Sequence, residues 1–328
     1  MFTLRFFLRR LSQGLVIVVL VSLLIFTLLR IVPGDPVRTM LGPMVTAEKA
    51  EEVARDLGLR DPIPLQYLRY MGQVLQGDMG HSFVRSAQGA STGGSRGENT
   101  FDAANRASVT GLILTTVPYS LLLAAASIGF ALIFSVPLGL AAGLKTGKWP
   151  DKLALYLSSV MVSMPTIWFG VVAIYILSAR TGWLPAIGYQ GPSYVILPAL
   201  VLAIELSPAL IRSISIAVST NMMAEFVSVG QVRGLGRAHM IIHHVLRNAA
   251  IPMLNLLGVQ IIGLLLGGLF VVEFIFNYPG LGLLMINAVL QRDFPVIQAI
   301  AMLASVVLVL VNILVDYSAT HIDKRLQF

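Results

Sequence analysis

The sequence predicts an all-α integral membrane protein with six membrane-spanning helices. Of its 328 residues, 56% are hydrophobic and 12% are charged, with a mean hydropathy of +0.81. Soluble domains carry about 25% charged residues. Six apolar runs are each long enough to cross a bilayer, which takes about 20 helical residues. One long basic interval interrupts the otherwise apolar second half of the chain.

The six predicted spans account for most of the chain. The first run follows Arg5, Arg9 and Arg10, exceeds the roughly 7–15 residues of a signal-peptide core and lacks a small-residue cleavage site, so we expect it to be retained. The second run is long enough to tilt or to break near Pro118 or Pro137. The runs are Leu11–Leu29, Leu112–Leu144, Leu153–Ala179, Val195–Val218, Ile251–Val272 and Val296–Val315.

Basic residues indicate which side of the membrane each loop faces. An even number of spans places both termini on one side, together with the loop of Lys145, Lys148 and Lys152 and the basic interval. The opposite loops carry only Arg180 and an Arg292 that is balanced by an acid. Because positive residues collect on cytoplasmic loops, both termini are predicted to be cytoplasmic. This distribution explains the net charge of +7 without nucleic-acid binding.

This topology divides the chain into four regions. They are residues 1–31 (N-terminal cytoplasmic segment and first span), 32–111 (extracytoplasmic region), 112–317 (membrane core, including a cytoplasmic hairpin at 220–251) and 318–328 (cytoplasmic tail).

The region 32–111 is too long to be a simple connection. Ala50, Val53, Ala54 and Leu57 follow helical spacing up to Gly58, and a second helix is expected between Pro64 and Gly77. The Gly/Ser-rich segment Ser86–Thr100 predicts a flexible insertion, which is more often a tolerated surface loop than a binding element.

The basic interval Glu225–Pro252 is predicted to form a polar hairpin at the cytoplasmic surface. Gly234 and Gly236 divide it into two short helical pieces, since each glycine costs roughly 1 kcal/mol in a helix interior. A helix–glycine–helix element of this kind is suited to docking a soluble partner.

Several kinds of chemistry are missing from the sequence. Without cysteine there is no disulfide or thiolate site. The Lys145–Lys148 segment lacks the first glycine of a phosphate-binding loop. His239 and His243 have the spacing of a zinc-protease motif, but Met240 replaces the required glutamate, so we interpret them as solvated histidines and expect no bound metal.

Polar residues inside the spans are the candidates for a translocation pathway. Glu205 lies near the middle of the fourth span, where a carboxylate faces a cavity or partner, or is protonated and bonded to a neighbouring helix; the sequence favours neither. Pro208 leaves a nearby carbonyl unbonded. Asn255 and Gln260 on the fifth span line a polar route or bond across helices, whereas packing suffices to explain the glycines of that span.

Several motifs resemble those of B-type permease subunits of ABC importers in the dipeptide/oligopeptide/nickel branch. In the central hairpin, the family pattern has a glycine, nine further residues, and then an apolar residue, any residue and leucine. Here the nine residues after Gly234 are followed by His244, Val245 and Leu246. Ser228 and Gln231 depart from the usual basic positions. The matching positions that precede this are Glu225, Phe226, Val227, Gly230, Arg233, Gly234 and Leu235.

The resemblance covers nearly the whole chain. It departs from the pattern at Ser86–Thr100 and at Glu205. Further similar segments are Arg30–Pro36, Leu57–Leu59 with Pro62, Gln66–Tyr67, Gly77–Gly80, Leu184–Pro185, Val272–Glu273 with Phe276, Pro279–Gly282, Arg292–Asp293, Asn312, Asp316 and Asp323–Arg325.

This resemblance implies the type I ABC importer permease fold in a bacterial inner or plasma membrane. It implies a homologous second permease, two ABC ATPase subunits that bind the hairpins, and an extracytoplasmic solute-binding protein. ATP and Mg would be used by the ATPase subunits and not bound by this chain. The cargo would be a dipeptide, an oligopeptide, a nickel chelate or another small solute.

An ion-coupled secondary transporter is the alternative function. It would use Glu205 and Asp316 as carriers, but such proteins usually show two similar inverted halves, and the sequence shows no such repeat. No catalytic constellation indicates a membrane enzyme.

Overall fold

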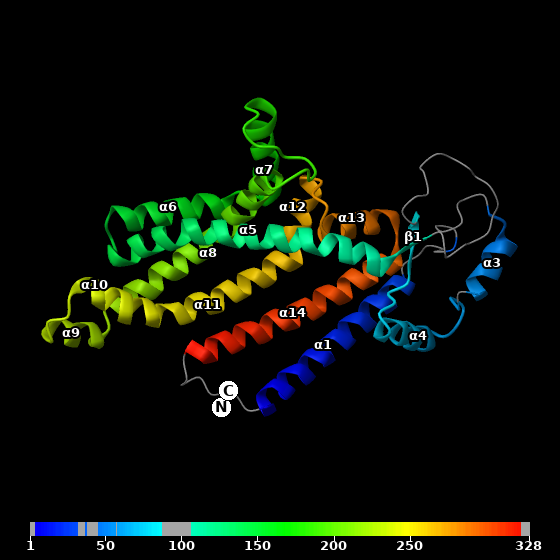
Figure 1. The fold of residues 1–328 in the computed structure, drawn as a ribbon, viewed down its shortest axis with the longest axis horizontal. Helices are drawn as coiled ribbons and strands as arrows, with labels where there is room; N and C mark the ends of the chain where they lie inside the picture. Colours follow the sequence, from blue (N-terminus) through cyan, green and yellow to red (C-terminus); the bar gives the residue numbers. More distant parts are fainter. Residues whose placement is uncertain (1–3, 32–36, 38–44, 57, 87–105, 323–328) are drawn as a thin grey trace. The chain divides into compact units, whose positions relative to one another are not determined.

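The computed structural model describes residues 4–31, 37, 45–56, 58–86 and 106–322 (Figure 1). The chain divides into two compact units. Unit 1 comprises Met1–Pro118 and Leu283–Val307, and unit 2 comprises Tyr119–Gly282 and Leu308–Phe328. Two long helices, α5 (Val109–Leu144) and α14 (Phe294–Ile322), contribute to both units.

The described residues contain five helices that are long and apolar enough to cross a membrane, or six spans if one bent pair is counted once. This confirms the predicted six-span, largely helical fold. Besides α5 and α14, the spans are α1 (Leu4–Ile31), α8 (Ser193–Met222), the continuous series α11 (Leu246–Gly263), η4 (Leu264–Gly268) and α12 (Leu269–Ile275), and the bent pair of α6 (Trp149–Ser163) with α7 (Thr166–Ala173) and η2 (Ile174–Arg180).

In unit 1, the two helices expected after the first span are present as α3 (Ala47–Asp56) and α4 (Ile63–Leu75). Gly58 and Gly77 follow them with φ of +65° and +85°, a backbone region that glycine enters without a steric penalty. The prediction that these helices end before Gly58 and Gly77 is therefore confirmed.

The sequence analysis did not predict the small antiparallel pair of β1 (His81–Ser86) and β2 (Arg106–Ser108), in which His81 lies opposite Ser108. Within unit 1, Asp293, which directly precedes α14, holds β1 close to the start of that helix. Its carboxylate accepts hydrogen bonds from the Ser82 hydroxyl and from the Phe83 N–H, the latter at 2.9 Å. The segment expected to be a flexible insertion falls, from residue 87 onward, outside the described residues.

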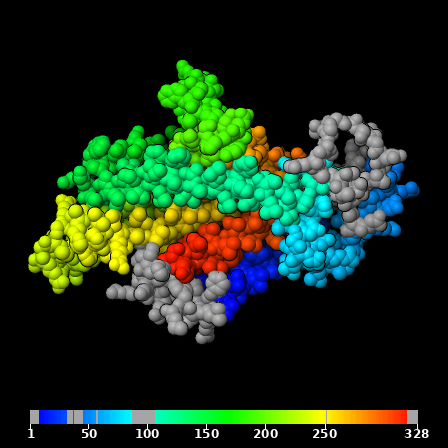
Figure 2. Space-filling view, in the orientation of Figure 1, coloured from blue at the N-terminus to red at the C-terminus, as the bar shows by residue number. Residues whose placement is uncertain are grey.

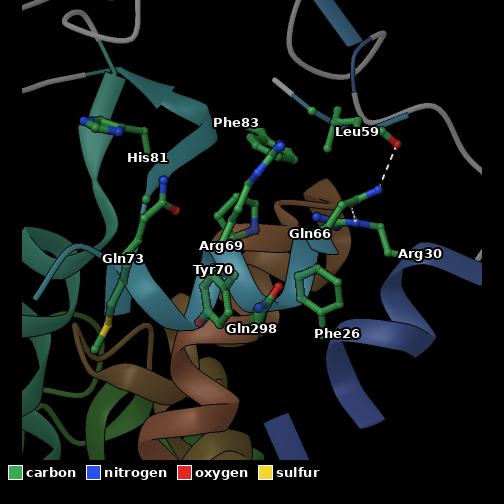
Figure 3. Close-up of a pocket in the computed structure, with 14 residues that line it drawn as sticks. Phe26, Arg30, Leu59, Gln66, Arg69, Tyr70, Gln73, His81, Phe83 and Gln298 are labelled. Atoms are coloured by element: carbon green, nitrogen blue, oxygen red, sulfur yellow. Dashed lines mark hydrogen bonds between the residues drawn. The ribbon is translucent and has the colours of Figure 1, made fainter. Parts of the chain in front are cut away.

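Unit 1 contains a cleft of about 290 Å³ (Figure 3). Arg30 lines it from α1 and donates to the Gln66 side chain of α4 at 2.8 Å. Tyr70 and Gln298 also line the cleft, and burial raises the pKa of the Tyr70 phenol to about 12. The polar side chains that line the cleft come from the first span, from α4, from β1 and from α14.

Unit 2 is built around α8, against which α6, α7, α11 and α12 all pack. The C-terminal half of α5 also lies close to it. A Cβ at Gly139 would stand 2.7 Å from the Ile214 Cβ, and one at Gly143 would stand 2.7 Å from the Ser215 carbonyl oxygen. Small residues allow membrane helices this close approach.

The third span differs from the prediction. A continuous helix was expected over Leu153–Ala179, but α6 ends at Ser163 and α7 leaves at 95° to it (Figure 1). Met164 is extended, with φ −98° and ψ 124°, because the proline that follows it disfavours helical backbone at the preceding residue. The span is therefore bent at Pro165.

For the second span the sequence left tilting and breaking open. The break near Pro118 or Pro137 is absent, and α5 runs through both prolines. Membrane helices tolerate proline where neighbouring groups satisfy the freed carbonyls. The fifth span contains the π-helical segment η4, and a short apolar helix, α13 (Leu281–Gln291), follows it; neither was predicted.

Candidate functional sites

The predicted central hairpin is present at one end of unit 2, between α8 and α11 (Figures 1 and 2). It consists of α9 (Glu225–Val232), a turn, α10 (Arg237–Met240) and the π-helical segment η3 (Ile241–Val245), which continues into α11. The helix break at Gly-Leu-Gly is therefore confirmed, but only α9 is a short separate helix, because the second piece continues through η3 into α11.

The turn after α9 is a complete Schellman motif, a glycine-based helix end. Gly234 has φ +79°, and its N–H donates to the Gln231 carbonyl at 3.0 Å. The Leu235 N–H donates to the Gly230 carbonyl, also at 3.0 Å. These two bonds satisfy carbonyls that the helix end would otherwise leave unpaired, so the direction of the hairpin is fixed by the left-handed conformation of Gly234.

Four of the predicted coupling residues face inward. Val227 and Gly230 are buried, while Phe226 and Leu246 are partly buried. A residue larger than glycine at position 230 would collide with the Met240 thioether, whose sulfur lies 3.2 Å from where a Cβ would be. The apolar cluster that they join holds the hairpin on α8 and α11; its buried members are Ile214, Ala217, Val218, Val227, Met240, Val245 and Ala249.

The other four coupling residues face outward: Glu225, Arg233, Gly234 and Leu235 are exposed. The sequence analysis missed two apolar residues on the same surface. Val229 is 50% and Val232 is 90% exposed, although a solvated helix usually presents polar groups at such positions. An exposed surface that mixes valine with arginine is typical of a protein-binding site.

The histidines of the hairpin form no metal site among the described residues. His239 and His243 stack at 4.2 Å between ring centroids, and both side chains are exposed.

Glu205 lies on α8 close to two irregular backbone segments, the bend before α7 and the π-helical segment η4. Its Oε2 accepts a hydrogen bond from the Thr166 hydroxyl at 3.0 Å, and Thr166 is the first residue of α7 after the bend at Pro165. Gly268, the last residue of η4, lies beside the carboxylate, because a Cβ built there would be 3.5 Å from both oxygens, an ordinary van der Waals contact. Pro208 removes a helical hydrogen bond one turn further along α8.

The other two pathway candidates lie on α11. Asn255 is exposed and Gln260 is half-buried. Neither is hydrogen-bonded to Glu205 in the described part of the chain. The structure therefore groups Glu205 with Thr166, a contact across 39 residues that no local sequence pattern indicates.

Glu273 forms a second polar site, and it is completely buried. Its Oε1 accepts a hydrogen bond from the Ser120 hydroxyl, and its Oε2 accepts one from the Gly282 N–H, both at 2.6 Å. The Ser120 oxygen in turn accepts the Leu281 N–H at 2.8 Å. These contacts involve α5 and the backbone after α12, so this buried carboxylate joins elements of unit 2 and is not open to a solute.

Comparison with known proteins bears on the whole chain. Residues 135–328 match the family described as binding-protein-dependent transport system inner membrane component. Residues 3–124 match the N-terminal part of such membrane components. Neither the family nor the relatives below support the ion-coupled alternative.

Several relatives align with this chain over nearly the whole length of both proteins. A putative peptide permease protein of Brucella ovis is 32% identical over 336 residues, which cover 99% of each chain. The glutathione transport system permease protein GsiC of Salmonella paratyphi A is 32% identical over 325 residues, again covering 99% of each chain. The corresponding protein of Escherichia coli is 31% identical over 309 residues, or 94% of each.

Solved structures share the fold at low sequence identity. An inward-facing MetNI methionine ABC transporter chain superposes with a TM-score of 0.54 at 16% identity, covering 65% of this chain and 96% of that one. A chain of an amino acid ABC transporter gives 0.50 at 16% identity, covering 65% and 94%. This chain belongs to the family of binding-protein-dependent transport system inner membrane components, as the membrane-spanning permease subunit of an ABC importer.

Proposed function

We propose that this permease carries short peptides, or peptide-like solutes such as glutathione, into the cell. The observation that carries the proposal is the end-to-end similarity to permeases named for peptides and for glutathione, at 32% identity over 99% of each chain. Similarity over the full length includes the inserted helices of unit 1 as well as the membrane core.

The transporter would contain this chain, a homologous second permease, two ATPase subunits and an extracytoplasmic solute-binding protein. The lack of a nucleotide site in this chain supports separate ATPase subunits, which would use ATP and Mg. The segment Lys145–Lys148 forms a turn in which Gly147, with φ +75°, donates its N–H to Asp151 at 2.8 Å. That turn leads into α6 and lacks the glycine-rich sequence that cradles phosphates.

The central hairpin would couple the permease to an ATPase subunit. Val229, Val232, Arg233 and Leu235 would contact the ATPase, while the buried cluster transmits the force to α8 and α11. ATP binding would close the ATPase dimer and draw the two hairpins together. The paired permeases would then rotate to open the cavity between them outward, with Glu205, Asn255 and Gln260 along the pathway.

Replacing Gly234 by valine tests the coupling role. A side chain in the left-handed region costs roughly 1–2 kcal/mol, and about 1.4 kcal/mol corresponds to a tenfold change in the population of the native turn. We expect Gly234→Val to insert into the membrane normally and to lower ATP-driven uptake about tenfold per ATP hydrolysed. The measurement is the ratio of uptake to ATP hydrolysis in proteoliposomes.

Gly236 offers the matched control. It has φ −63° and no atom within 4 Å of an added Cβ, so Gly236→Val should behave as wild type. Gly234→Asn should retain much of the coupling, because asparagine tolerates the left-handed region. Equal loss in Gly234→Val and Gly236→Val, or normal coupling in Gly234→Val, would show that this turn is not a coupling element.

From the charge asymmetry we infer that both termini and the α5–α6 turn lie in the cytoplasm and that the inserted helices of unit 1 lie outside. Because the chain has no cysteine, Glu48→Cys on α3 and Lys148→Cys before α6 each introduce a single thiol. In intact cells, a membrane-impermeant maleimide should label Glu48→Cys and should label Lys148→Cys only after permeabilisation. External labelling of Lys148→Cys would refute this topology.

Transport itself is tested with the complete complex in proteoliposomes and a labelled set of peptides of two to five residues plus glutathione. We expect uptake of at least one of these solutes that requires ATP hydrolysis, the binding protein and this chain. Uptake driven by a proton or sodium gradient without ATP would contradict the importer assignment. ATP-driven uptake of nickel chelates with none of the peptides would contradict the proposed cargo.

A further inference from the structure

The helix at the centre of unit 2 is buried except along one narrow stripe. Of the five single-helix spans, α8 has the largest buried share, and the residues that flank Glu205 and Arg212 on other faces are largely buried. From Glu205 to the end of α8, the exposed positions are Glu205, Arg212, Ile216 and Thr220, with Ala209 half-buried. Their spacing of three or four residues places them on one face.

This stripe carries an acid and a base within the depth of the membrane. At 1.5 Å per residue, Glu205 and Arg212 lie about 4 Å and about 7 Å from the middle of α8. Both distances are well within the hydrocarbon half-thickness of about 15 Å. Charged residues at such depth are costly unless they face water, a partner or a substrate, so their common stripe marks a polar surface.

The two charges do not neutralise each other. Oppositely charged residues pair along a helix at three or four positions apart, but these two are seven positions apart. Within the described ranges, neither side chain forms an ion pair. Thr166 donates to one oxygen of Glu205, and no described residue donates to the other. Both groups are therefore free to bind a ligand.

A hollow of about 770 Å³ runs beside this stripe between α6 and α8. It begins at Pro208, one turn from Glu205, and passes Arg212. Serine hydroxyls line the α6 side, and the buried Ser158 Oγ has no hydrogen-bond partner among the described residues. At the far end, Asp151 is already engaged by the Gly147 N–H. Arg212 is thus the one cationic side chain among the residues lining this hollow.

We propose that Glu205 and Arg212 together bind the two charged ends of a short zwitterionic peptide, an assignment that rests on the proposed function. The carboxylate would accept the terminal ammonium group, and the guanidinium would bind the terminal carboxylate through two parallel hydrogen bonds. The two residues are about 10 Å apart along the helix axis. An extended chain spans about 3.3–3.6 Å per residue, so this separation fits about three residues.

The test is direct binding to the permease–ATPase complex in lipid nanodiscs, without the binding protein. Titration calorimetry would compare trialanine with N-acetyl-trialanine and with trialanine amide. We expect the wild type to bind trialanine about tenfold more tightly than either blocked peptide, and more tightly than dialanine or pentaalanine. Glu205→Gln should lose only the discrimination against acetylation, and Arg212→Gln only that against amidation.

Arg180→Gln is the matched control, because Arg180 is exposed on η2 outside the stripe, and it should bind as wild type does. Unchanged ATP hydrolysis would show that each variant is folded and assembled. Equal binding of free and blocked peptides by the wild type, or no binding at millimolar trialanine, would overturn the inference while leaving peptide import to its own assay. If Glu205→Gln and Arg212→Gln both lower the yield of assembled complex but still discriminate between free and blocked peptides, the inference is wrong. The stripe would then be a contact with the second permease.

Discussion

The structure depends on one constraint: a charged group within a membrane protein must be fully hydrogen-bonded or must face water or a ligand. Glu273 satisfies the first condition, because both of its oxygens accept hydrogen bonds from Ser120 and from backbone of the segment after α12. Gly282 and Gly280 are required there, since a Cβ at either would collide with the Glu273 carboxylate. The chain reversal between α12 and α13 follows from this buried carboxylate.

In our proposal, Glu205 and Arg212 satisfy the second condition. They lie on the only open stripe of a helix whose other faces are packed against α5, α6, α7, α11 and α12. The same helix ends at the hairpin proposed to bind the ATPase, and the cluster around Val227 and Val245 fastens that hairpin to it. A movement applied at the hairpin would therefore reach the stripe through a single rigid element. This gives a physical route from ATP hydrolysis to substrate release.

Local chemistry made part of this structure predictable. Glycine at a helix end specified the turns after α3, α4 and α9, because few other residues adopt positive φ there. Proline was not equally informative. Pro118, Pro137, Pro198 and Pro208 lie within continuous helices, whereas Pro165 ends one. The difference depends on neighbours distant in sequence, as do the Thr166–Glu205 and Ser82–Asp293 hydrogen bonds, which link residues 39 and 211 positions apart.

The most direct test of this account is the water accessibility of Ala209, which lies between the two charges on the stripe. The chain has no cysteine, so Ala209→Cys can be probed alone in the complete complex with a charged, water-soluble methanethiosulfonate reagent. Ile133→Cys, on the exposed apolar face of α5, is the control, with a side chain that is 64% exposed in the single chain. The account predicts rapid modification at Ala209 in at least one nucleotide state and little at Ile133. If Ala209→Cys stays unmodified in every nucleotide state, the stripe does not face a water-filled pathway.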